Sequence, residues 1–202
     1  MAVSKKFSAG RIQEAYRAGV REFGENYVQE FAEKKPHVED LVDARFHLIG
    51  HLQSNKARQA CDLFDVIETA DSVKLLNRLN AAAAERGRPM EVLLEVKLSG
   101  EESKSGAEPV ALPGLLEAAN AYPSIHLTGL MTMPPWSDDP EQSRPYFQRL
   151  AELARRFGLT RLSMGMSHDF EVAIEEGATL IRVGTALFGP RPKPHETVAS
   201  RA

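Results

Sequence analysis

Segments with the hydrophobic periodicity of strands alternate along this chain with segments that have the periodicity of helices. This pattern predicts a regular succession of strands and helices. Short runs such as RFHLI (45–49) and EVLLEVKL (91–98) have the composition and alternation of strands. The stretches between them carry helix patterns bounded by capping residues and glycines. The predicted strands are residues 1–5, 21–24, 45–49, 64–68, 91–98, 125–131, 162–165 and 179–183. The predicted helices are residues 9–18, 26–34, 54–60, 71–87, 112–121, 140–157, 168–176 and 185–189.

Strands that alternate with helices indicate a parallel α/β architecture, which can close in two ways. One is an open, doubly wound sheet, and the other is an eight-stranded barrel. No G-x-G-x-x-G follows the first strand, so the best marker of a dinucleotide-binding sheet is missing. The sequence therefore favours a single (β/α)8 TIM-type barrel over residues 1–191. The proline-rich run that begins at Pro190 predicts a disordered tail over residues 192–202.

The composition and charge of the chain limit the kinds of molecule that it is expected to bind. The 202 residues are 43% hydrophobic, which suffices for one core, and the net charge of −3 has no strong sign. We therefore expect no nucleic-acid partner and no membrane partner, and no apolar run approaches the ~20 residues of a membrane span. Cys61 is the only cysteine, so an internal disulfide is impossible and a cytoplasmic location is expected.

The stretch from residue 162 to residue 189 carries the strongest candidate for a binding site. Ser167 occupies the position expected of a helix N-cap, and Gly184 and Thr185 open a last short helix. Two helix N-termini side by side present unpaired N–H groups to an anion. Arg182 shares a strand face with Gly184, so the pattern predicts a phosphate site with a cation beside it. Barrel enzymes commonly bind phosphate after strands seven and eight, although two ordinary strand–helix junctions fit the same residues.

A lysine at the mouth of a barrel, beside a phosphate site, suggests a ligand that is both an aldehyde and a phosphate. Lys5 ends the first predicted strand and is the leading candidate to hold such a ligand as a Schiff base. Lys6 is its neighbour, and strand pleating sends the two side chains to opposite faces. Most lysines simply lie exposed on the protein surface. Other lysines of this chain could also form the Schiff base. These competitors are Lys56, Lys97 and Lys104.

Other notable residues have simpler interpretations. His47 and His51 straddle a strand and a loop with no third ligand in register, so a zinc site is not expected. Four methionines either wall an apolar ligand or fill the core: Met131, Met133, Met164 and Met166. The basic residues of the predicted helices are expected to be solvated: Lys34, Lys35, Arg58, Arg155 and Arg156.

Seven collinear motifs, read together, resemble the pyridoxal-phosphate homeostasis protein family. They are AVSK (2–5), FGENYVQE (23–30), FHLIGHLQSNK (46–56), SGEESKSG (99–106), GLMTMPP (129–135), SMGMSHDFEVAI (163–174) and RVGTALFG (182–189). The resemblance covers nearly the whole chain and implies a barrel similar to that of alanine racemase. It also implies that pyridoxal 5′-phosphate is bound and is stored or handed on, with the apoenzymes that need this cofactor as partners.

The resemblance implies a role for individual residues. Those implied to hold the cofactor are Lys5 through a Schiff base, Ser167, Gly184 and Thr185 at the phosphate, Arg182 near the pyridine nitrogen, and Asn26 close by. The chain departs from the family where Lys6 replaces the usual threonine and Lys97 the usual asparagine. Family members also carry a helix before AVSK, so a barrel lacking this usual N-terminal helix is expected.

Two functions stay open at this point. The first is a non-catalytic carrier of the cofactor, and the second is an amino-acid racemase-like enzyme that depends on it. Racemisation needs an acid–base group on each face of the substrate, one of them being the lysine. Tyr27 is the one tyrosine of four that follows a strand on the ligand side. The carrier is the favoured function.

Overall fold

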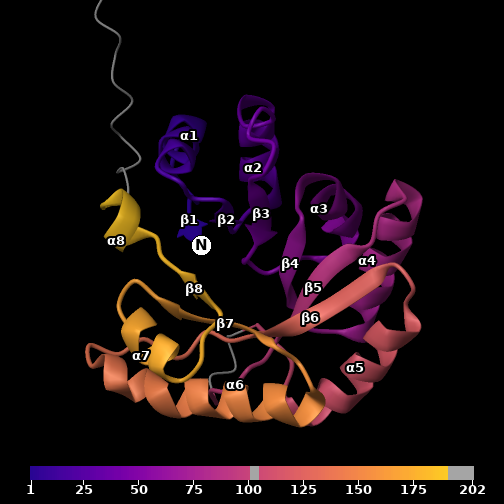
Figure 1. Cartoon of the computed structure of the whole chain (residues 1–202). Helices are drawn as coiled ribbons and strands as arrows, with labels where there is room; N and C mark the ends of the chain where they lie inside the picture. The colour runs from indigo at the N-terminus through magenta and orange to yellow at the C-terminus, as the bar shows by residue number, and fades with distance from the viewer. Residues whose placement is uncertain (101–104, 191–202) are drawn as a thin grey trace, which may run out of the picture.

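The computed structural model describes residues 1–100 and 105–190. Within them, eight parallel strands form one sheet in the order β1 to β8. The sheet closes on itself, because Ala2 pairs with Val183 and the backbone N–H of Val3 donates to the carbonyl oxygen of Val183 at 2.8 Å. Helices follow the strands around the outside (Figure 1). The fold is therefore the (β/α)8 barrel that the sequence favours.

The elements follow the predicted order, with shifts of a few residues at their ends. The strands are β1 Ala2–Val3, β2 Glu22–Glu25, β3 Arg45–Leu48, β4 Val66–Ala70, β5 Met90–Glu95, β6 Ile125–Met131, β7 Arg161–Met166 and β8 Leu180–Arg182. The helices are α1 Ala9–Arg17, α2 Val28–Lys34, α3 Ala57–Leu63, α4 Val73–Arg86, α5 Leu112–Ala121, α6 Arg144–Phe157, α7 Phe170–Glu175 and α8 Thr185–Phe188. Short 3-10 turns lie at Lys35–His37, Ser54–Lys56, Pro109–Ala111 and Pro140–Ser143.

The first strand is shorter than predicted, and this positions the candidate lysine. β1 ends at Val3, and the N–H of Ser4 still donates to the carbonyl oxygen of Gly24 on β2. Lys5 lies in the turn that follows, and Lys6 turns the chain outward with a φ of 64°, which is rare for a residue with a side chain. The prediction that strand pleating separates the two lysines is therefore wrong, because both lie in a turn beyond the end of β1. The predicted tail and Lys104 lie outside the described residues.

Apolar side chains fill the space between the sheet and the helices. Phe31 of α2 packs against Phe46 of β3, with ring centroids 4.6 Å apart, and against Phe64, 4.8 Å away. Asp71 and Ser72 are both suitable caps for α4 by residue type, and the structure selects Ser72, whose hydroxyl accepts a bond from the N–H of Leu75. No helix in the described part of the chain is both long enough and apolar enough to cross a membrane.

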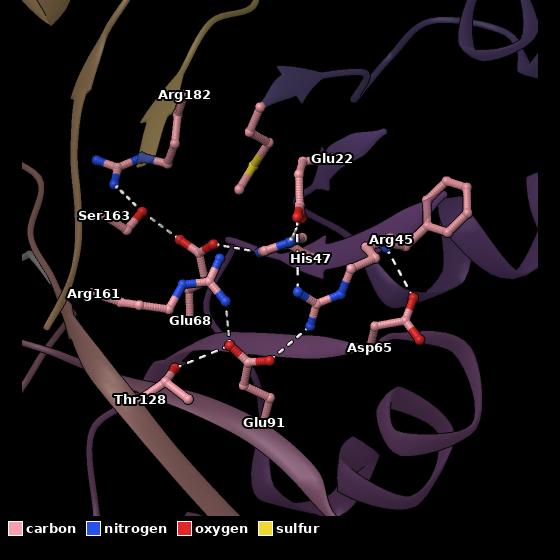
Figure 2. Close-up of polar contacts among 12 residues, drawn as sticks. Glu22, Arg45, His47, Asp65, Glu68, Glu91, Thr128, Arg161, Ser163 and Arg182 are labelled. Carbon is pink, nitrogen blue, oxygen red and sulfur yellow. Dashed lines mark hydrogen bonds and ion pairs between the residues drawn. The ribbon is translucent and has the colours of Figure 1, made fainter. Parts of the chain in front are cut away.

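The inside of the barrel is polar as well as apolar. A small cluster of Val66, Leu93 and Met131 is buried there, apart from the main core. At the amino-terminal end of the barrel, Arg45 and Arg161 both bind the carboxylate of Glu91, the first at 2.7 Å (Figure 2). These ion pairs close the barrel at the end opposite to the loops that follow the strands. Ligands therefore have access to the interior from the carboxyl ends of the strands.

Candidate functional site

A cavity of about 570 Å³ opens at the carboxyl ends of the strands. The structure brings together all six residues that the sequence and the resemblance proposed, although they come from four separate parts of the chain. Barrel geometry explains this convergence, because every loop that follows a strand reaches the same end. The residues that line the cavity are Val3, Lys5, Asn26, Ile49, Met133, Trp136, Met166, Ser167, His168, Arg182, Gly184, Thr185 and Ala186.

Ser167 binds the first turn of α8, whereas the sequence predicted that it would cap the helix now identified as α7. The predicted cap of the 168–176 helix is wrong, because α7 begins at Phe170 and Asp169 occupies its N-cap position. The carboxylate of Asp169 accepts a bond from the N–H of Met166 at 2.6 Å and so stabilises a turn ahead of the helix. The hydroxyl of Ser167 instead accepts bonds from the N–H groups of Gly184 at 3.1 Å and Ala186 at 3.4 Å. Ser167 therefore links the loop after β7 to the first turn of α8.

Arg182 is the buried cation of the cavity wall, with 3% of its surface exposed. Its guanidinium donates to the hydroxyl of Ser163 and to the carbonyl oxygen of Thr132, both at 2.8 Å. Ser163 in turn donates to the carboxylate of Glu68 at 2.5 Å (Figure 2). Burial lowers the pKa of Arg182, and the charges of Glu68, Asp169 and Glu95 oppose this shift. The guanidinium is held in one orientation by two elements of the barrel.

A chain of polar contacts continues from Arg182 through the barrel. Glu68 accepts a bond from Nδ1 of His47 at 2.6 Å, and Glu22 binds the other ring nitrogen (Figure 2). Burial alone would lower the pKa of His47, but its bonds to the two carboxylates raise it. Burial alone would likewise raise the pKa of Glu68, but His47, Arg182 and Ser163 hold it below the usual value. Since a carboxylate only accepts bonds, a doubly protonated His47 satisfies both neighbours.

This interior network was not found from the sequence. His47 and Glu68 lie in apolar strands, and β4 is buried along its whole length. A polar residue in a half-buried strand normally faces solvent, whereas both faces of a barrel strand are covered. One feature of the sequence could have indicated this network. Three predicted strands each carry a glutamate, namely Glu22, Glu68 and Glu91.

Lys5 lines the cavity in front of a second buried ion pair. Lys34 was expected to be solvated, and this expectation is wrong, because only 8% of the residue is exposed. Its ammonium donates to the carbonyl oxygen of Ser4 at 2.9 Å and to the carboxylate of Glu25 at 2.8 Å. Burial raises the pKa of Glu25, and the charge of Lys34 opposes the shift. These two oxygens replace the water that Lys34 loses on burial. Because Lys34 binds Ser4, the contact also fixes the turn that carries Lys5.

The competing lysines lie elsewhere. Lys6 is exposed, and its N–H binds the carboxylate of Glu30. Lys56 lines a separate groove with Tyr27. Lys97 lines a neighbouring cavity and forms an ion pair with Glu108 at 3.6 Å.

Asn26 is held at the cavity by a close approach of two backbones. A side chain at Gly50 would bring its Cβ within 2.2 Å of the carbonyl oxygen of Asn26, so this position requires glycine. The carbonyl oxygen of Gly50 accepts a bond from the hydroxyl of Thr69 at 2.9 Å. Oδ1 of Asn26 is buried and has no hydrogen-bond partner among the described residues. A polar ligand can supply that partner.

The cavity also contains residues that the sequence reasoning did not assign to it. Trp136 and His168 pack against each other with ring centroids 4.7 Å apart. Met133 and Met166 line the cavity, whereas Met131 and Met164 are fully buried, so both earlier interpretations of the methionines hold for two of them each. One side of the cavity is thus apolar, and the other carries Lys5, Arg182 and the start of α8.

Known proteins resemble this chain over nearly all of its length. The family described as alanine racemase, N-terminal domain, matches residues 1–192. The pyridoxal phosphate homeostasis protein of Aquifex aeolicus is 43% identical over 197 residues, which cover 95% of this chain and 86% of that protein. The chain belongs to the pyridoxal phosphate homeostasis protein family. Its relative in Pseudomonas aeruginosa is 44% identical, over 95% of this chain and 84% of that protein.

Solved structures agree with this family assignment. The structure of PipY from Synechococcus elongatus, determined with PLP bound, superposes with a TM-score of 0.86 and is 43% identical. The match covers 94% of this chain and 91% of PipY. Alanine racemase from Clostridium difficile superposes with a TM-score of 0.77 at 13% identity, over 96% of this chain and 52% of the racemase. That second likeness establishes the shared barrel fold alone.

Proposed function

We propose that this chain binds pyridoxal 5′-phosphate in the 570 Å³ cavity and maintains the supply of this cofactor without turning over a substrate. The observation that carries the proposal is the convergence of Lys5, Arg182 and the Ser167–Gly184 junction on one cavity. When bound, the cofactor supplies an aldehyde that condenses with primary amines and a ring that withdraws electrons. The relatives named above, and PipY with its bound PLP, support the assignment.

The residues of the cavity fit the chemistry of the cofactor. The hydroxyl of Ser167 already accepts two backbone N–H bonds, so its own hydrogen is available to donate to a phosphate. Thr185 adds a hydroxyl donor at the same point, and Gly184, whose N–H binds Ser167, lets the backbone approach the phosphate because it has no side chain. These features support the phosphate role proposed for all three. Oδ1 of Asn26 offers an acceptor for a ring hydroxyl group. Lys5 supplies the primary amine that holds the aldehyde, with loss of one water molecule.

Two features together favour a carrier over an enzyme: the charge of Arg182, which does not by itself forbid catalysis, and the position of Tyr27. Catalysis with this cofactor is strongest when a carboxylate keeps the pyridine nitrogen protonated. A buried guanidinium at that nitrogen opposes protonation, because arginine keeps its charge and has no acceptor. Racemisation also needs a second acid–base group opposite Lys5. Tyr27 lines the groove of Lys56 and is 51% exposed, so it does not support that second role. We further propose that the held cofactor is passed to apoenzymes that depend on it.

The test is a spectroscopic titration of the purified chain with pyridoxal 5′-phosphate and with pyridoxal. Hydrogen bonds to a charged group contribute about 1.5–3 kcal/mol each, so the loss of two weakens binding roughly 100-fold or more. Equal affinity for the two compounds would contradict the phosphate site at Ser167, Gly184 and Thr185.

A second measurement locates the lysine. Borohydride reduction of the loaded protein, followed by peptide mass mapping, should put the adduct on Lys5. Lys5→Ala should abolish it, and Lys6→Ala is the matched control, since Lys6 faces outward beside it. An adduct mainly on Lys6 or Lys97 would overturn the assignment.

A further inference from the structure

A second cavity, of about 410 Å³, lies beside the first. The two share Met133, Trp136 and Met166, which therefore form the wall between them. The second cavity is also lined by residues at and after the end of β5 and after β3 and β6, among them Glu95, Val96, Lys97, Ser99, His51 and Pro134. Its walls are largely apolar, and Glu95 is the acidic residue among those that line it.

Glu95 is the unusual residue of this cavity. The residue is 3% exposed, and its Oε2 has no hydrogen-bond partner within the described ranges. Glu68 is equally buried, yet His47 and Ser163 bind its two oxygens. A buried carboxylate without a partner is costly, and native structures rarely leave such a group unexplained.

Among the described residues, no cation forms a hydrogen bond or an ion pair with Glu95. The charge of Arg182 acts on Glu95 from β8, but its guanidinium donates to Ser163 and Thr132. Lys97 pairs with Glu108. Burial and the charge of Asp71 raise the pKa of Glu95 to about 7, so both protonation states occur near neutral pH.

We propose that the second cavity binds small primary amines with an apolar body. The ammonium group donates to the carboxylate of Glu95, and the apolar part packs against Met133, Trp136 and Met166. An anion is disfavoured because the carboxylate repels it. A neutral apolar molecule leaves Glu95 unpaired, so it gains nothing from that group.

Binding of the amine does not depend on the proposed function, because Glu95, which would bind its ammonium group, lines the second cavity and not the proposed cofactor site. One consequence does rest on that function. The wall between the cavities is shared, so an amine bound at Glu95 lies beside the aldehyde proposed to be held at Lys5. For release, the ammonium would first pass a proton to the carboxylate of Glu95. Its nitrogen would then bond to the aldehyde carbon as the bond from that carbon to Nζ of Lys5 breaks, and the two remaining protons of the amine would pass to Nζ.

Trp136 provides the readout, since it is the only tryptophan of the chain and lies between the cavities. Benzylamine is titrated into cofactor-free protein at pH 8, where Glu95 is mostly ionised, and fluorescence is followed. The uncharged benzyl alcohol is matched in size and tests the role of charge in the wild-type protein. Glu95→Gln removes the charge, and Glu108→Gln is the control, because it removes the other carboxylate near Lys97.

We expect saturable binding of benzylamine, at least tenfold weaker binding of benzyl alcohol, and a loss of at least tenfold in affinity in Glu95→Gln. Glu108→Gln should bind as the wild type does. Equal binding of the amine and the alcohol would overturn the proposal without any variant. Undiminished binding by a folded Glu95→Gln protein would overturn it as well. Neither outcome bears on cofactor binding, which is measured separately.

Discussion

Replacing Glu95 with glutamine tests whether this buried carboxyl group has the environment described above. Burial, with the nearby charge of Asp71, raises its pKa from 4.5 to about 7. The folded protein therefore holds the proton more tightly than the unfolded chain does. Glu95 stabilises the fold fully below pH 4.5, and this contribution is lost as the pH rises through 7. One pKa unit corresponds to about 1.4 kcal/mol, so the whole effect is about 3 kcal/mol.

The assay is urea unfolding of the wild type and of Glu95→Gln, followed by circular dichroism at pH 5 and at pH 8. Glutamine keeps the shape of the protonated acid and cannot ionise. We expect Glu95→Gln to be more stable than the wild type at pH 8 by about 2–3 kcal/mol, with most of the difference gone at pH 5. Other groups titrate in the same range, so the quantity that matters is the difference between the two proteins.

Glu108→Gln is the control, since Glu108 is exposed and its loss should give no comparable dependence on pH. Asp71→Asn should reduce the effect of Glu95, because Asp71 contributes to the raised pKa. Parallel stability curves for the wild type and Glu95→Gln would show that Glu95 is ionised normally in the folded protein. That result would contradict the raised pKa of Glu95.

Three further predictions concern the other buried charges and the proposal that the chain does not turn over amino acids. Ser163→Ala removes the hydroxyl between Arg182 and Glu68, and urea unfolding should show a loss of about 2–4 kcal/mol; an unchanged midpoint would contradict the role of this bridge. Lys34→Met leaves Glu25 buried without its cation, so the loss of stability should be larger at pH 8 than at pH 5, where the carboxyl can protonate; equal losses would refute this reasoning. Alanine incubated in heavy water with cofactor-loaded protein should not exchange its α-proton at ordinary enzyme rates by NMR; rapid exchange that Lys5→Ala abolishes would favour the racemase-like function.

Much of this fold was predictable because its signals are local. The order of strands and helices follows from apolar periodicity, and a cap just before α4 follows from residue type. Barrel closure then places Lys5, Asn26 and Arg182 at one end, even though no local pattern connects them. The grouping of the site therefore depends on topology more than on accurate ends of elements. The predicted strand 91–98 extends three residues beyond the end of β5, and this error did not change which residues meet at the site.

The sequence was less informative where two local solutions compete. Ser167 and Asp169 are both good capping residues, and nothing in their spacing decides which of them precedes α7. The structure favours Asp169 because its carboxylate also accepts a bond from Ser143, 26 positions earlier, at 2.8 Å. The burial of Lys34 was missed for a similar reason. Its ammonium group pairs with the carboxylate of Glu25, which lies in a different element, so the local sequence of α2 does not reveal the contact. Contacts distant in sequence settle both cases.

If the cofactor binds as proposed, the different charges of the two cavities would set its orientation. A phosphate dianion finds hydroxyl and N–H donors at the start of α8, where Ser167 links β7 to Gly184. On the other side of Met133, Trp136 and Met166, Glu95 repels the same dianion whenever it is ionised. The phosphate is therefore favoured at one end and opposed at the other, and the aldehyde is left near Lys5. An amine has the reverse preference, since Glu95 attracts it while Arg182 and Lys5 do not. Under the two proposals, the charges at this end of the barrel would therefore place an anionic cofactor and a cationic amine at different positions, so that both could bind without competing.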